Sequence, residues 1–392
     1  MIDIVNKEDC VLCGSCVNVC PKEAISYKAR YYDFQYPVID PEKCVKCNLC
    51  QKVCPVLLNE DNREIGFPKA YIGRVADRYT RMDSTSGGFF SALSEFVLSK
   101  GGYVCGAVLT DDFHVQHVVS ADRTIVQLMR GSKYAQSDMK LAMREVKSLL
   151  NAGKIVLFSG CPCQIAGIRA YLKEIPDSLI LMEVVCHGIP SDKMLQSYLN
   201  VQREKMQANI TRLEFRNKKK GWHRSAVRIE FSNGRIYHSP ITVDAYMAGY
   251  FGNITLKSSC YHCRFRNFRS GSDFTVGDFW GAEIEVPELD DNTGLSAIMV
   301  NTQKGLKIIQ NLHLELYTGD LKKIIQYNST ITKSVEVNPK RIPFYCYAEE
   351  NGYPEAIKEF LWEKPYQKTK RILRYLLRVC KHRILGKGKT LY

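Results

Sequence analysis

The sequence lacks any long apolar run, and nowhere does a stretch approach the eighteen consecutive apolar residues of a membrane-spanning helix. It also lacks a basic and apolar beginning, because Met1 is followed by Ile-Asp-Ile-Val-Asn-Lys-Glu-Asp. We therefore expect no membrane span, no secretion, and a cytoplasmic location. Without an oxidising compartment, the 16 cysteines do not predict a disulfide framework. They call instead for metal or redox chemistry.

Acidic residues are missing from the C-terminal end. The last 29 residues, from Lys364 to Tyr392, contain ten Lys and Arg and no Asp or Glu. The net charge of the chain is +14, so the preceding residues carry only 14 − 10 = +4. A nucleic-acid-binding protein is more often basic across a folded face, with aromatic side chains beside the charges. We therefore expect no nucleic-acid partner.

Two cysteine runs with the same spacing lie in the first 55 residues. Each reads C-x2-C-x2-C-x3-C-P, which is the spacing of bacterial ferredoxins, where the fourth cysteine binds the cluster of the other run. Three thiolates on a tight loop can hold three corners of one 4Fe-4S cubane, and the fourth starts a helix that leads away. The expected ligand sets are Cys10, Cys13, Cys16 and Cys54 for one cluster, and Cys44, Cys47, Cys50 and Cys20 for the other.

A pair of zinc sites is the alternative, because C-x2-C pairs also bind zinc. Zinc needs four ligands from two such pairs, which leaves no role for the third cysteine and the Cys-Pro of each run. Ligand number and spacing therefore favour clusters.

The pattern of apolar residues predicts regular elements along the whole chain. Ser and Thr at 84–86 are expected to cap the helix at 89–98, and Gly101-Gly102 to end it. Strands are expected at 24–27, 36–39, 103–109, 115–119, 154–159, 179–185, 211–216, 226–231, 235–239 and 295–301, and helices at 89–98, 139–150, 164–173, 192–207 and 304–317. The alternation in the middle predicts an α/β fold with a parallel stretch, in which ligands collect where strands end and helices begin.

Several segments together resemble the family of coenzyme F-420 hydrogenase/dehydrogenase beta subunits, whose members are iron–sulfur flavoproteins. They follow the family's order: Ser84–Gly88, Gly131–Ser137, Gly160–Gln164, Cys186–Gly188, Cys260–Cys263 and Asp273–Gly281. The ending Gly277–Gly281 is similar to a bacterial branch that is often associated with cell-surface polysaccharide genes. There are two departures. Cys161 stands where the family often has threonine, and the chain from about Asn328 matches nothing.

The resemblance and the residues together predict three domains. An α+β ferredoxin-like module with two 4Fe-4S clusters is expected at 1–60, followed by a polar linker. An α/β flavin-binding and iron–sulfur oxidoreductase domain with a mixed sheet is expected at 68–327, and a helical extension at 328–392.

The resemblance implies a third 4Fe-4S cluster beside the flavin. By position its ligands are Cys163, Cys186, Cys260 and Cys263, and Cys161 is left over. The residues support this independently, because two of these cysteines follow adjacent parallel strands and a C-x2-C loop could close over them. Two buried cysteines with a small zinc knuckle are the alternative, since four sulfurs suit either metal.

The resemblance also implies non-covalently bound FAD. The candidate flavin contacts are Ser84, Thr85, Ser86, Gly87, Gly88, Lys133, Tyr134, Gln136, Ser137, Gln164 and Asp278. Lys133 would place a positive charge near the N1–O2 side of the ring, and Tyr134 would stack. An ordinary exposed lysine is the alternative for Lys133. His187 is the candidate for proton transfer, or else a structural histidine; Asp278 could equally cap a turn.

These features predict an oxidoreductase that joins one-electron transfer through clusters to two-electron hydride chemistry at FAD. Its partner would be a redox protein or a small hydride donor or acceptor, and a homo-oligomer is left open. An electron-transfer subunit without its own substrate is the alternative, and a degenerate scaffold is a third. Residues 366–385 form a basic amphipathic pattern that predicts peripheral contact with an anionic membrane, or else a terminal helix packed on its domain.

Overall fold

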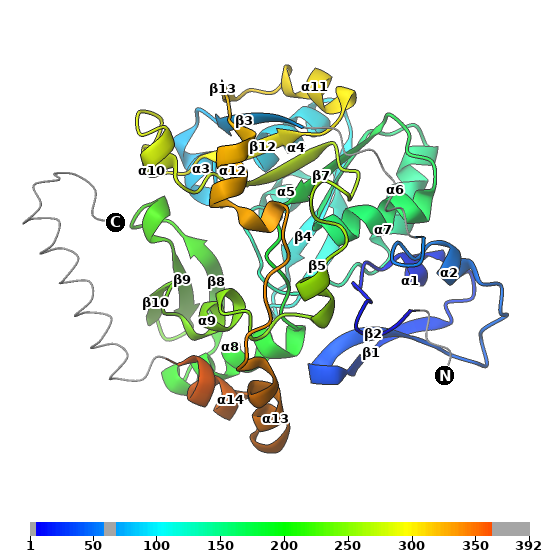
Figure 1. Ribbon diagram of the computed structural model, residues 1–392, viewed down its shortest axis with the longest axis vertical. Helices are drawn as coiled ribbons and strands as arrows, with labels where there is room; N and C mark the ends of the chain where they lie inside the picture. The colour runs from blue at the N-terminus through cyan, green and yellow to red at the C-terminus, as the bar shows by residue number, and fades with distance from the viewer. Residues whose placement is uncertain (1–4, 59–67, 363–392) are drawn as a thin grey trace, which may run out of the picture. The chain divides into compact units, whose positions relative to one another are not determined.

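The computed structural model describes residues 5–58 and 68–362 (Figure 1). The chain folds as two compact units. One contains the residues up to Gln196 together with Thr255–Val337, and the other contains Ser197–Ile254 together with the residues from Asn338 onward. The second unit is thus an insertion joined to the C-terminal part of the chain. The three domains expected from the sequence stay a prediction.

The N-terminal module is built around a two-stranded antiparallel sheet. Strand β1 (Ile25–Arg30) pairs with β2 (Phe34–Ile39), as the short strands expected there predicted, and η1 (Tyr31–Asp33) joins them. Two short helices, α1 (Ser15–Val19) and α2 (Leu49–Lys52), begin inside the two cysteine runs. Each follows a residue with left-handed backbone, Gly14 or Asn48, which lets the cysteine loop turn tightly.

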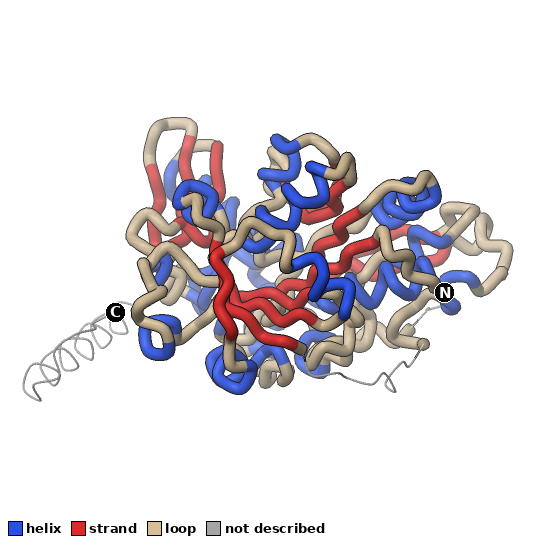
Figure 2. The backbone as a smooth tube through the Cα atoms, turned by 90° about the horizontal axis from the view of Figure 1, so that it is seen from above, coloured by secondary structure: helices blue, strands red, loops and turns tan. Residues whose placement is uncertain are grey.

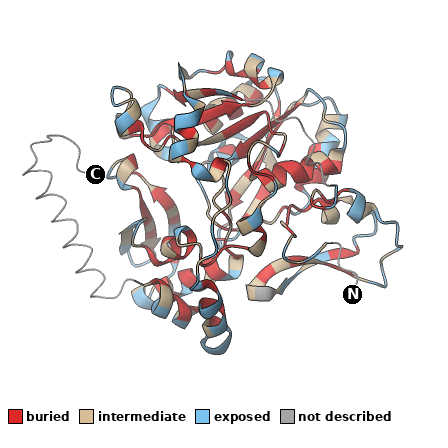
Figure 3. Ribbon diagram, in the orientation of Figure 1, coloured by how far each residue is buried: buried red, intermediate tan, exposed pale blue. Residues whose placement is uncertain are grey.

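An eight-stranded mixed sheet forms the centre of the first unit. Its order is β13-β3-β12-β11-β7-β6-β4-β5, and the neighbours β4, β6, β7 and β11 run parallel. The strands are β3 (Lys69–Arg74), β4 (Tyr103–Leu109), β5 (Val115–Ser120), β6 (Val156–Gly160), β7 (Leu179–Val184), β11 (Phe274–Asp278), β12 (Ser296–Val300) and β13 (Glu315–Thr318). The central strands are runs of apolar residues because both faces of the sheet are covered (Figure 3).

Helices cover the two faces of this sheet (Figure 2). On one face, α4 (Phe89–Ser99), α5 (Arg123–Leu128) and α11 (Gln303–Ile309) contribute Leu93, Val126 and Ile308, with other apolar residues, to one core. On the other face, α6 (Ala142–Asn151) and α7 (Pro162–Leu172) form a second core with β6 and β7. The remaining elements of this unit are α3 (Arg78–Asp83), η3 (Ser258–His262), α10 (Ala282–Glu285), α12 (Leu321–Tyr327) and η4 (Ser329–Ile331).

The second unit contains a three-stranded antiparallel sheet in the order β10-β9-β8. Helix α8 (Asp192–Met206) leads into it from the first unit. Its elements are β8 (Ile210–Asn217), η2 (Trp222–Arg224), β9 (Ala226–Phe231), β10 (Ile236–Pro240), α9 (Ala245–Phe251), α13 (Arg341–Asn351), α14 (Tyr353–Ala356) and η5 (Ile357–Leu361). The expected Asn233-Gly234 turn is present, with Gly234 in the left-handed region at φ 78°.

Two expectations about local structure were wrong. The segment 304–317 is not one helix, because α11 ends at Ile309 and residues from Glu315 form the edge strand β13 beside β3. The N-cap of α4 is Gly88 in left-handed conformation rather than a Ser or Thr hydroxyl. In the structure the Ser84 hydroxyl donates back to the Thr80 carbonyl, and that of Ser86 donates to the Leu295 carbonyl.

No helix in the described residues has both the length and the apolar character needed to cross a bilayer. The predicted basic amphipathic helix at 366–385 lies outside the described residues, as does most of the linker expected after Leu58.

Candidate functional site

Four cysteines from the two runs line one cavity in the N-terminal module. We call Cys10, Cys13, Cys16 and Cys54 the first thiol set. Three of them come from the loop before α1 and the start of that helix, and Cys54 arrives from the end of the second run. The structure thus brings together the four residues that the spacing assigned to one cluster.

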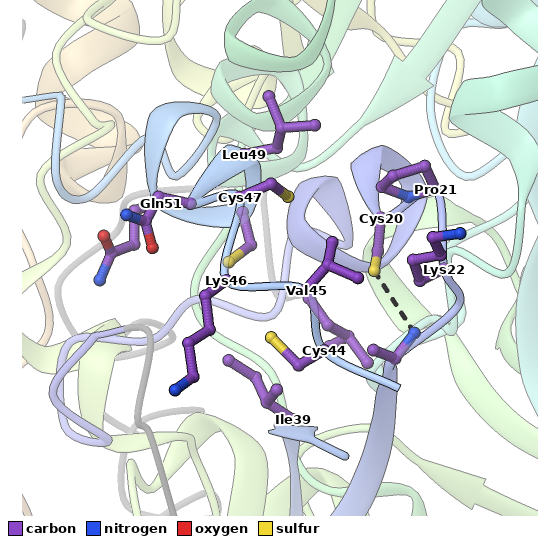
Figure 4. Close-up of a pocket in the computed structure, with 14 residues that line it drawn as sticks. Cys20, Pro21, Lys22, Ile39, Cys44, Val45, Lys46, Cys47, Leu49 and Gln51 are labelled. Carbon is purple, nitrogen blue, oxygen red and sulfur yellow. Dashed lines mark hydrogen bonds between the residues drawn. The ribbon is translucent and has the colours of Figure 1, made fainter. Parts of the chain in front are cut away.

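A second cavity gathers the other four cysteines of the runs (Figure 4). We call Cys20, Cys44, Cys47 and Cys50 the second thiol set. Cys20 follows α1, and its Sγ accepts a hydrogen bond from the Ala24 amide at 3.3 Å. The exchange of the fourth cysteine between the runs is therefore a feature of the fold, and it was predicted from the sequence.

The chemistry of these cavities fits a cationic metal centre. Burial raises the pKa of the Cys13 thiol to about 12, and burial likewise raises the pKa of Cys10 and of Cys16. Neighbouring thiolates add to the increase, since each would repel the others. Four thiolates can share such a cavity only when positive metal ions compensate their charge.

A third group of cysteines lies at the carboxyl ends of β6 and β7. Cys163 is in the first turn of α7, Cys186 follows β7, and Cys260 and Cys263 lie at η3. We call these four the third thiol set. Burial raises the pKa of Cys163 and that of Cys260, and each of the four thiols interacts electrostatically with another member. The expected juxtaposition across two adjacent parallel strands is present.

Cys161 belongs to this group as a fifth cysteine, which the sequence argument left over. Its thiol hydrogen-bonds with Cys186, which lowers the pKa of Cys186 to about 7 and raises that of Cys161. Cys161 is also the N-cap of α7, where its amide donates to Gln164 Oε1 at 2.8 Å. The predicted flavin residue Gln164 thus serves a capping box in this structure.

The first and third thiol sets are joined by direct packing. Ser15 in α1 donates a hydrogen bond to the Gly167 carbonyl in α7 at 2.9 Å, and Ser259 donates to the Cys10 carbonyl at 3.2 Å. A Cβ atom at Gly167 would lie 2.6 Å from the Cβ of Cys13. Only glycine therefore allows α7 to approach the first thiol set this closely.

Two buried cations flank the loop that carries Cys260 and Cys263, and the sequence argument missed both. The Arg266 guanidinium donates to the carbonyls of Cys186 and His187 at 2.5 and 2.9 Å, and it interacts electrostatically with three cysteines of the third set. Arg266 is 6% exposed and pairs with no carboxylate of the described residues. The C-x2-C-x2-R spacing is the signal that could have indicated it.

Lys257 is the second of these cations. It is fully buried, and its ammonium lies 3.6 Å from the ring centroid of Tyr36 and 5.1 Å from that of Phe34. It also interacts electrostatically with Cys10. A positive charge thus lies beside the first thiol set as well as beside the third.

The Ser84–Gly88 loop lies beside the ends of β3 and β12. The Gly87 amide donates to Ser296 Oγ at 3.0 Å, and a Cβ at Gly87 would lie 2.3 Å from the Gly73 carbonyl oxygen. Ser296 is the cross-strand partner of Asp278 at the end of β11. The loop and Asp278, two predicted flavin segments, therefore lie at the same edge of the sheet.

The Gly131–Ser137 loop joins this edge through a hydroxyl contact. Thr85 Oγ1 accepts a hydrogen bond from the Ser132 amide at 2.9 Å. Farther along, the Gln136 amide donates to the Pro190 carbonyl at 3.1 Å, close to His187 in the sequence. Tyr134 is half-buried, with left-handed backbone at φ 44°. The loop thus connects the flavin candidates with the segment that holds Cys186.

Lys133 is neither a freely exposed lysine nor directed at an open site. Its ammonium donates to the Leu128 and Arg130 carbonyls at 2.9 and 2.7 Å, at the C-terminal end of α5. Burial lowers the pKa of Lys133 to about 7. The charge predicted to face the flavin ring is therefore placed on the carbonyl end of a helix.

Ser137 and Gln136 show two different situations. Ser137 Oγ lies 2.7 Å from His117 Nδ1, and the opposite ring nitrogen of His117 lies 3.2 Å from the Ser159 carbonyl. The carbonyl oxygen of the Gln136 side chain is buried without a hydrogen-bond partner in the described part of the chain. An acceptor of this kind fits a ligand that carries an N–H group, as the flavin ring does.

Comparison with known proteins identifies both parts of the first unit. Residues 153–323 match the family model that describes the C terminus of the coenzyme F420 hydrogenase/dehydrogenase beta chain. Residues 9–57 match a 4Fe-4S dicluster domain, and residues 36–89 match a second model of such a domain.

Two relatives are informative about extent. The F subunit of the F(420)H(2) dehydrogenase of Methanosarcina mazei is 22% identical over 381 residues, which covers 92% of this chain and 96% of that protein. A chain of the xenon-derivatised F420-reducing [NiFe] hydrogenase complex from Methanosarcina barkeri is 17% identical, with a TM-score of 0.45, and covers 76% of this chain and 97% of its own length. Residues 153–323 thus belong to the family of coenzyme F420 hydrogenase/dehydrogenase beta subunits, and the chain joins this domain to a 4Fe-4S dicluster domain.

Proposed function

We propose that this protein is an iron–sulfur flavoprotein that couples one-electron transfer through three 4Fe-4S clusters to hydride chemistry at FAD. The observation that carries the proposal is the order of the thiol sets. The second set shares the N-terminal module with the first, and the first contacts the third through Gly167 and Ser259. Clusters in these positions would form a path from the N-terminal module to the sheet edge where the flavin candidates meet.

The protein's own residues would hold the cofactors as follows. The three thiol sets supply four sulfurs each, and Cys161 remains as an additional thiol beside the third. FAD, when bound, accepts or donates a hydride and exchanges electrons singly. For FAD we propose the Ser84–Gly88 loop, the Gly131–Ser137 loop, Gln164 and Asp278, with the unpartnered Gln136 side-chain oxygen accepting from the ring. His187 would handle the proton.

The hydride partner is proposed from the relative in Methanosarcina mazei, which is a dehydrogenase of F(420)H(2). We infer that a reduced deazaflavin or a nicotinamide is the donor or the corresponding oxidised form the acceptor. The alternative function is an electron-transfer subunit that has no substrate and exchanges electrons only with a partner protein.

One experiment separates the two functions. The chain is purified anaerobically, its flavin is identified after denaturation, and reduced F420 and NADPH are mixed with it separately in a stopped-flow instrument. The proposal expects bound FAD and cluster bleaching by at least one of these donors, without any added protein. A fully iron-loaded protein that contains no FAD and ignores both donors would support the electron-transfer subunit.

A further inference from the structure

The second thiol set lies at the surface of its module, in contrast to the first. Cys47 is exposed, whereas Cys10, Cys13 and Cys54 are only 7–8% exposed. In Figure 4, Val45, Lys46 and Cys47 come from the same loop, which lies over the cavity between α2 and β2. A cluster in the second set is therefore the iron–sulfur group that a molecule from outside can approach most closely.

The surface around this cavity is basic. Lys22 and Lys46 line the cavity and are exposed, and no Asp or Glu lines it. The segment 41–52, which carries three of the four cysteines, contains three lysines and one acid, Glu42. The nearby carboxylate of Glu23 is paired with Arg144 at 3.2 Å. The field that an approaching molecule meets is therefore positive.

The same surface has the mixed composition of a transient protein interface. We call it the lysine-rimmed face, and it consists of Lys22, Val45, Lys46, Cys47, Asn48 and Gln51. Val45 is 59% exposed and offers an apolar centre, and the two amide side chains offer hydrogen bonds beside it. Short-lived redox encounters use small interfaces of this kind, in which charges steer the approach.

We propose that the lysine-rimmed face docks an acidic one-electron carrier protein, which exchanges electrons with the cluster of the second thiol set. The proposal rests on the proposed function, because it needs that cluster. In each encounter one electron leaves the carrier and reduces the cluster, or moves in the reverse direction. No bond is made or broken and no proton is transferred. A lipid surface fits less well, since Val45 is the single strongly exposed apolar side chain that lines this cavity.

The test uses the anaerobic holoprotein and a small acidic two-cluster ferredoxin reduced by dithionite as the probe. The rate constant for electron transfer into the chain is measured by stopped flow at low and at high salt. The variant Lys22→Glu/Lys46→Glu reverses two charges on the face. The matched control Lys28→Glu/Lys154→Glu reverses two exposed lysines that do not line the cavity.

The proposal expects the face variant to lower the second-order rate constant at least about tenfold at low salt, and the difference to shrink as salt rises. The control variant should stay within about twofold of the unaltered protein. Equal losses in both variants would mean that total charge governs the encounter, and would overturn the docking site. An unchanged rate in the face variant would overturn it as well.

Two further readouts keep this result separate from the proposed function. Iron content and FAD content are measured for every variant, and direct reduction of the clusters by dithionite is recorded. A protein with full clusters but no hydride activity would overturn the proposed FAD chemistry and leave the docking result valid. Loss of binding to anionic phosphatidylglycerol vesicles, with ferredoxin kinetics unchanged, would instead assign the face to a membrane.

Discussion

At the scale of single residues, Arg266 decides the charge of the third thiol set. Its guanidinium is buried against the carbonyls of Cys186 and His187 and has no carboxylate partner in the described residues. A buried cation without a counter-ion is unfavourable unless a negative group lies beside it. A metal centre held by four thiolates is negative, so the arginine and the centre would stabilise each other.

This leads to a prediction for Arg266→Gln. Removing the positive charge should lower the reduction potential of the third cluster, on the order of 60 mV if the charge contributes about 1.4 kcal/mol for one electron. Arg266→Lys keeps the charge and should recover most of the potential. A redox titration followed by electron paramagnetic resonance measures the shift. An unchanged potential with full iron content would show that Arg266 only positions the Cys186 loop.

Lys133 gives a second prediction at this scale. Lys133→Met removes the donor to the Leu128 and Arg130 carbonyls, so the free energy of unfolding should fall by about 1 kcal/mol. If the lysine also serves FAD, flavin occupancy or flavin potential should fall with it. Urea unfolding and released FAD are measured together, with Lys133→Arg as the control that keeps the charge. Reduced stability at full, unaltered flavin would make Lys133 a helix cap alone.

At the scale of elements, the contact between α1 and α7 is the tightest joint between the two iron–sulfur regions. A Cβ at Gly167 would overlap Cys13, and Ser15 depends on the Gly167 carbonyl for its hydrogen bond. Gly167→Val should therefore push α7 away from the first thiol set. We expect loss of iron from the first set and at least partial retention of the second set, because no residue of α7 lines the second cavity.

Iron analysis and paramagnetic resonance of reduced Gly167→Val protein test this. Gly167→Ala serves as the smaller change, and its effect should be intermediate. Full cluster content with unaltered spectra in both variants would mean that the helix can shift at little cost, and that the close approach has no role in holding the first cluster.

The elements also show what sequence reasoning can and cannot reach. The parallel strands and the two ligand sets were predictable, because cysteine spacing and buried apolar runs are local signals. Strand β13 was mistaken for helix, since Leu314 and Leu316 gain their burial from β3 and its core, which lie far away in the sequence. Cys161, Arg266 and Lys257 were missed for the same reason. Their roles depend on neighbours that only the folded chain supplies.

At the scale of the whole molecule, the number of clusters is the central quantity. Three thiol sets predict about twelve iron and twelve sulfide per chain in anaerobically prepared protein. Iron, sulfide and zinc are measured by elemental and colorimetric analysis. Eight of each would remove the third cluster, and one zinc per chain in addition would assign the third set to a structural metal. The variant Cys260→Ser with Cys263→Ser should remove about four iron and leave the other eight.

The insertion of Ser197–Ile254 has a consequence for how the protein is made. The first and second thiol sets are complete once Cys54 has been synthesised, but the third waits for Cys263, beyond the insertion. Strand β3 likewise waits for β12, whose first residue follows Lys69 by 296 − 69 = 227 positions. At roughly 5–20 residues per second, this delay on the ribosome is roughly ten to forty-five seconds. Iron delivery to the nascent chain thus has two windows, and the second opens only after the insertion has been translated.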